Sequence, residues 1–116
     1  MEDEWFEKMK EVCDVLNGRL KISKNEITCE DIAGRNLSLI FNLNSKKIEI
    51  FGAVVHEDAD QSMKLSKKIQ LLKPSDIKIE KSLRRVEIGD EARIMALPYS
   101  ALVILEKASI VFEPAD

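Results

Sequence analysis

The chain has 116 residues, of which 45% are hydrophobic and 34% are charged, and its net charge is -3. This length and composition fit one globular domain with its own hydrophobic core, and they exclude a disordered chain. The longest nearly apolar stretch, residues 94–105, is shorter than the ~20 residues of a membrane-spanning helix. The first residues are acidic, unlike a signal peptide. We therefore expect a single cytoplasmic domain over residues 1–116, with no membrane association.

Residues 4–16 are predicted to form an amphipathic helix. Their apolar side chains recur at spacings of three and four, which places them on one helical face. Asn17 and Gly18 follow, and both residue types tolerate the left-handed conformation that ends helices.

Trp5, Phe6 and Met9 are the candidate partner-binding residues on this helix. Trp5 and Phe6 are adjacent, so their side chains point about 100° apart. A wide buried face that covers both is the favoured interpretation. In the alternative, one of the two is partly exposed and anchors an interface, a role in which tryptophan is enriched.

The next segments predict an antiparallel meander. Residues 19–23 and 27–32 are short strand-like runs. Residues 37–55 alternate apolar and polar side chains on either side of Asn44 and Ser45, which is the pattern of a hairpin with one buried face.

A second helix is predicted over residues 59–72. Met63, Ser66, Ile69 and either Leu72 or Lys73 fall near one helical face, and Pro74 follows its expected end.

The remaining segments predict further antiparallel strands, so the predicted fold class is α+β. Residues 101–105 are continuous and apolar, as in a strand buried on both faces, although proline also suits the first turn of a helix starting at Pro98. The expected strands are residues 77–79, 86–88, 93–97, 101–105 and 110–112, and a turn is expected at Gly89 and Asp90.

The two cysteines, Cys13 and Cys29, have no CxxC spacing. We expect both to be buried thiols, with a disulfide between them as the less favoured alternative.

No pattern in the chain predicts catalysis, a cofactor or a metal ion. His56 is the single histidine, and the carboxylates beside it in a predicted loop do not make a full coordination shell. A serine or cysteine nucleophile needs a base, and the four glycines of the chain form no phosphate-binding motif such as GxxxxGK(S/T) or GxGxxG. We therefore expect no enzyme, although a site assembled across a dimer interface stays open.

The strongest anomaly is the basic segment, residues 64–85, which holds eight basic and two acidic residues, a net of +6. Such a cluster favours an alternative function, anion or nucleic-acid binding. Against it, the segment has no aromatic residue for base stacking, and the chain has a pI near 5.3. The segment would also complement the acidic first helix of a second copy in a homodimer. The candidate anion-binding residues are Lys64, Lys67, Lys68, Arg84 and Arg85.

Residues 5–72 resemble the small acidic chaperones of type III secretion effectors. The resemblance lies in element order and apolar spacing, carried by Phe6-Glu7-Lys8-Met9, Asn25-Glu26-Ile27-Thr28-Cys29, Leu37-Ser38-Leu39-Ile40-Phe41 and Lys47-Ile48-Glu49-Ile50-Phe51-Gly52-Ala53-Val54. It implies an intracellular α+β homodimer that binds part of another protein. The chain departs from that family in its basic segment and in its strand-like end.

These observations together predict a non-enzymatic protein-binding domain, chaperone- or adaptor-like and dimeric. The partner is expected to be a protein, with nucleic acid as the less favoured possibility.

Overall fold

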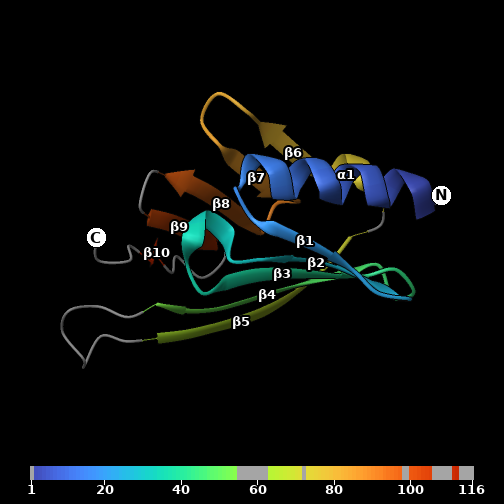
Figure 1. Ribbon diagram of the computed structural model, residues 1–116, viewed down its shortest axis with the longest axis horizontal. Helices are drawn as coiled ribbons and strands as arrows, with labels where there is room; N and C mark the ends of the chain where they lie inside the picture. Colours follow the sequence, from blue (N-terminus) through green and yellow to red (C-terminus); the bar gives the residue numbers. More distant parts are fainter. Residues whose placement is uncertain (1, 55–62, 72, 98–99, 106–110, 113–116) are drawn as a thin grey trace.

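The computed structural model describes residues 2–54, 63–71, 73–97, 100–105 and 111–112. In these residues the fold is mostly β, with two antiparallel sheets of five strands each and one α-helix (Figure 1). The predicted α+β class is therefore wrong. Sheet A has the order β1-β2-β3-β4-β5, and sheet B has the order β10-β9-β8-β7-β6. Each sheet buries one face against the other sheet or the helix, as in a sandwich.

Sheet A is a meander of β1 (Arg19–Ile22), β2 (Glu26–Glu30), β3 (Leu37–Asn42), β4 (Lys47–Val54) and β5 (Met63–Gln70). The predicted hairpin is confirmed as β3 and β4, in which buried Leu39 lies opposite buried Ile50. At its turn, the side-chain oxygen of Asn42 accepts hydrogen bonds from the backbone N–H groups of Asn44 and Ser45, both at 3.0 Å.

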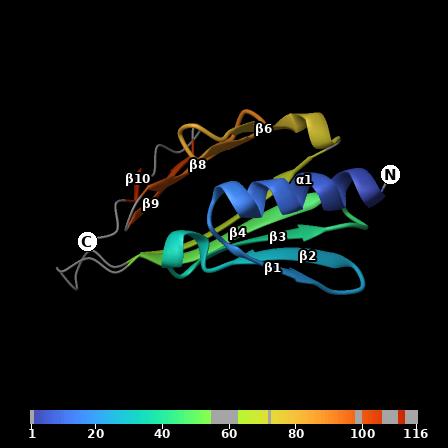
Figure 2. The ribbon, with the colours of Figure 1, turned by 45° about the horizontal axis from the view of Figure 1, so that its top comes forward.

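Helix α1 (Glu2–Val15) confirms the predicted first helix and lies between the two sheets (Figure 2). It contacts β1 and β2 on one side and β6 and β7 on the other. The helix ends as expected: Asn17 has a φ of 52°, and the N–H of Gly18 bonds to the carbonyl of Cys13 at 2.9 Å. With 14 residues, α1 is too short to cross a membrane, and no other helix in the described ranges is long and apolar enough.

The predicted second helix is wrong where the structure describes it, because residues 63–70 form strand β5. Leu65 and Ile69 of this strand are buried, and so is Leu71 just after it. These residues are four and two positions apart, the even spacing of one face of a strand. The exposed Lys67 occupies the inner-face position between Leu65 and Ile69 and hides the alternation in the sequence. The expected helix start lies outside the described residues. The resemblance rests on the element order helix, meander, helix. In the described residues, strand β5 takes the place of the second helix.

Sheet B contains β6 (Ile77–Glu80), β7 (Arg85–Ile88), β8 (Ala92–Leu97), β9 (Ser100–Leu105) and β10 (Val111–Phe112). The expected turn at Gly89 is confirmed, with a φ of 56° at that residue. The open choice after Pro98 resolves as a strand from Ser100. The expectation that this strand is buried on both faces is wrong, because Leu102 and Ile104 are only partly buried. The two 3₁₀ turns of the described chain are η1 (Ile32–Gly34) and η3 (Pro74–Asp76).

Cys13 of α1 and Cys29 of β2 form a disulfide, with their Cα atoms 5.5 Å apart. Both residues are buried, as expected, but the expectation of free thiols is wrong. The two cysteines are 16 residues apart in sequence, and the antiparallel meander brings their side chains together in the core. The bond ties α1 to sheet A.

Candidate protein-binding face

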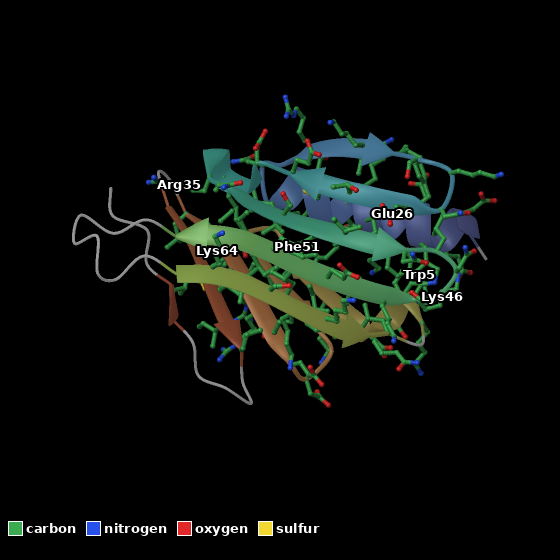
Figure 3. The ribbon with its side chains drawn as sticks, turned by 90° about the horizontal axis from the view of Figure 1, so that it is seen from below. Trp5, Glu26, Arg35, Lys46, Phe51 and Lys64 are labelled. Carbon is green, nitrogen blue, oxygen red and sulfur yellow. A yellow bond between two sulfur atoms is a disulfide. The ribbon has the colours of Figure 1, made fainter. Side chains whose placement is uncertain are left out.

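The outer face of sheet A, opposite the face that packs on α1, is uncovered in the described structure (Figure 3). Strand β4 alternates buried Ile48 and Ile50 with outward Lys47, Glu49 and Phe51. Phe51 thus places an aromatic ring on the polar side of the alternation, where it is partly exposed. A partly exposed aromatic side chain on an open sheet face is a candidate contact for a partner.

Phe51 lies in a hollow of about 290 Å³ on this face. It is directly opposite Ser38 on one neighbouring strand and Ser66 on the other, and these small side chains leave its ring accessible. Lys64 adds an ammonium group to the wall (Figure 3). The hollow can hold an apolar side chain with an anionic group beside it. Its lining residues are Asn36, Ser38, Phe51, Gly52, Lys64, Leu65 and Ser66.

Strand β5 borders the hollow and is the edge of sheet A, since it pairs with β4 and with no other described strand. At the end of the β4–β5 ladder, the N–H of Leu71 donates to the carbonyl of Lys46 at 2.8 Å. Hydrogen-bonded pairs alternate along an antiparallel ladder. Leu65, Lys67 and Ile69 therefore direct their backbone groups to β4. The residues whose N–H and C=O groups point to the free edge are Lys64, Ser66, Lys68 and Gln70.

The five predicted anion-binding residues do not form one cluster. Lys64 and Lys68 lie on the outer face of sheet A, and Lys67 lies on the opposite face of the same strand. Arg84 is in the turn between β6 and β7, and Arg85 begins β7, so both belong to the other sheet. A helix over these residues would place the three lysines on one face, whereas a strand separates Lys67 from the other two.

Two of these cations are already paired with carboxylates. Lys68 Nζ lies 3.5 Å from Glu49 Oε1. Arg85 Nη2 lies 2.7 Å from Glu80 Oε2 and 3.6 Å from Glu87 Oε1. Within the described residues, Lys64, Lys67 and Arg84 make no ion pair.

Of the predicted partner-binding residues, Trp5 and Met9 lie in the core, with exposed fractions of 3% and 0%. The Trp5 ring packs on Phe41, with centroids 4.2 Å apart and planes tilted by 31°. Phe6 is the partly exposed member of the aromatic pair, which is the less favoured of the two alternatives, and it stays a predicted contact residue. Trp5 and Met9 offer no free surface in this fold.

A second hollow of about 270 Å³ lies where the end of α1 meets the β6–β7 turn. It brings together groups of both signs, including the Lys81–Glu11 ion pair at 3.4 Å. The other lining residues are Asp14, Val15, Asn17 and Arg84. This mixture of charges gives no preference for anions.

In the part of the chain that the structure describes, no group of three or more His, Cys, Asp or Glu residues is placed to hold a metal ion. His56 lies outside that part. The Phe51 hollow was not predicted from the sequence, although one signal was available: Phe51 is an aromatic residue at an outward position of β4, where the other outward residues are charged.

Comparison of the chain with models of protein families, with curated proteins and with solved structures finds no match.

Proposed function

We propose that this chain is a non-enzymatic protein-binding domain, acting as a chaperone or adaptor, and that it binds its partner through the outer face of sheet A. The Phe51 hollow is the observation that carries the proposal. It joins a partly exposed aromatic ring to a rim of hydroxyl, amide and ammonium groups. Protein interfaces have this composition, with an apolar centre and a polar rim.

Binding is favoured over catalysis by the chemistry of the lining. Among the described residues that line the Phe51 hollow there is no histidine and no carboxylate, the groups that most often transfer protons in active sites. The anion-binding alternative is less favoured, because its predicted residues are divided between two sheets and partly neutralised.

A homodimer is part of the proposal. The exposed Glu4 and Glu7 of α1 and the exposed Lys73 and Lys78 of the basic segment would complement one another between two copies, which leaves the edge of β5 open for a partner. Sedimentation equilibrium at low and high salt tests this: we expect a dimer that weakens as salt screens the charges. A monomer at every protein concentration would remove this part of the proposal.

The binding function is tested by affinity capture from lysate of the source cells, with nuclease treatment and quantitative mass spectrometry. The baits are the wild-type chain, Phe51→Asp and the matched control Ile22→Asp. Ile22 is 58% exposed on β1, so it tests an added carboxylate away from the hollow. We expect one protein to be retained by the wild type and the control and lost with Phe51→Asp. Equal recovery with all three baits, or recovery of nucleic acid instead, would contradict the proposal.

A further inference from the structure

We propose that an extended acidic segment of a partner protein pairs with the free edge of β5 as an additional antiparallel strand of sheet A. Its central residue is large and apolar and reaches over Ser66 to Phe51, and its carboxylates lie beside Lys64 and Lys68. This inference rests on the proposed function, because it specifies the chemistry of the partner at the same site.

The backbone of β5 offers the hydrogen bonds for such a strand. The N–H and C=O groups of Lys64, Ser66, Lys68 and Gln70 point away from β4, and all four residues are exposed. No described strand pairs with them, and edge groups of this kind pair readily with an extended peptide. In an antiparallel addition, the residues opposite these four would exchange both hydrogen bonds with them.

The side chains of β5 specify what the added strand carries. Residues directly opposite Lys64, Ser66 and Lys68 place their side chains on the same outer face. Because Ser66 is small and lies opposite Phe51, a large side chain across from Ser66 reaches the aromatic ring. The expected pattern in the partner is acidic, any residue, apolar, any residue, acidic.

The positive charge of β5 disfavours partners other than an acidic strand at this edge. Strand β5 carries three lysines and no carboxylate. Lys64 and Lys67 have no ion pair among the described residues, and Lys68 has one exposed pair with Glu49. A second copy of β5 would place lysines near lysines, which is unfavourable. An acidic strand would gain ion pairs with Lys64 and Lys68, and Lys67 would attract it from the inner side.

The test uses the full chain and the peptide acetyl-Thr-Glu-Thr-Phe-Thr-Glu-Thr-amide, followed by amide hydrogen exchange in NMR spectra. We expect the peptide to slow exchange at Lys64, Ser66, Lys68 and Gln70 at least about tenfold, whereas Leu65, Lys67 and Ile69 are already protected by β4. N-methylation of the two Glu residues and the Phe removes the donors that face β5 and should abolish the effect. N-methylation of the central two Thr residues, whose N–H groups point away, should preserve it.

Variants of the chain test the side-chain contacts. Lys64→Glu with Lys68→Glu should weaken peptide binding about tenfold, whereas Lys47→Glu, on the same face of an inner strand, should change it much less. Ser66→Leu fills the route to Phe51 and should remove the preference for Phe over Ala at the centre of the peptide.

Three results would overturn the inference: no binding at millimolar peptide, equal binding of a peptide with Lys in place of Glu, or protection at other amides. Protection of the same edge by an oligothymidylate, lost at high salt, would also overturn it in favour of nucleic acid. If a lysate protein depends on Phe51 while the peptide fails, the proposed function stands and only this inference falls. If no protein depends on Phe51, the proposed function itself fails.

Discussion

Lys67 lies opposite Ile50 in the β4–β5 register, so a charged residue occupies an inner-face position of sheet A between buried Leu65 and Ile69. The position is tolerable because β5 is the edge of the sheet, and the long side chain carries its ammonium group past that edge to solvent. Inward charges on edge strands prevent unwanted pairing between sheets of different molecules.

Lys67→Leu is expected to increase self-association, since it leaves an exposed edge with an unbroken apolar inner row. Sedimentation velocity over a range of protein concentrations measures the effect. Lys10→Leu, at an exposed position of α1, adds the same side chain away from a strand edge and serves as the control. Equal sedimentation of the two variants would show that Lys67 does not protect the edge.

Loss of the Cys13–Cys29 disulfide is expected to lower the free energy of unfolding by about 3 kcal/mol, the typical effect of a cross-link over a loop of this length. Both cysteines are buried, so a reductant reaches the disulfide only in the unfolded chain. The protein is therefore unfolded, reduced and refolded before the measurement. Urea unfolding with and without reductant gives the difference. The variant with Cys13→Ala and Cys29→Ala should not respond to reductant, and an equal response would assign the effect elsewhere.

Gly18→Ala is expected to destabilise the fold by about 1–3 kcal/mol, because an added methyl group overpacks the core. A Cβ at Gly18 would overlap Cys29 Sγ and lie 3.0 Å from Cys13 Sγ. Replacing both cysteines by alanine removes these sulfur atoms, so the penalty should shrink in that background. A double-mutant cycle from urea unfolding measures the coupling, and identical penalties in both backgrounds would refute the contact.

Trp5→Ala is expected to cost about 3–5 kcal/mol of stability, since it removes a buried ring packed on Phe41. Thermal unfolding followed by circular dichroism measures the loss. Phe6→Ala removes the neighbouring, partly exposed ring and should cost clearly less. If Phe6→Ala lost more stability than Trp5→Ala, Phe6 rather than Trp5 would be the core residue. Trp5 is the single tryptophan, so its wild-type fluorescence should shift to longer wavelength on unfolding.

Short-range patterns in the sequence predicted several elements correctly. Helix α1 was predictable because its apolar residues repeat at helical spacing and Asn17 and Gly18 end it locally. The β3–β4 hairpin was predictable because its alternation is unbroken on both sides of a polar turn. In both elements the determining contacts lie within about twenty residues, a distance over which periodicity is informative.

Only the tertiary structure decided the rest. Strand β5 gives an ambiguous pattern, because Lys67 interrupts its alternation and the neighbour that makes it a strand, β4, pairs through backbone groups that carry no sequence signal. The Cys13–Cys29 bond depends on where the meander returns beneath α1. The Phe51 hollow exists because Ser38 and Ser66, from two other strands, flank the ring. The sequence by itself determined the local periods of α1 and the hairpin, whereas long-range strand pairing decided the mostly β fold and its candidate binding face.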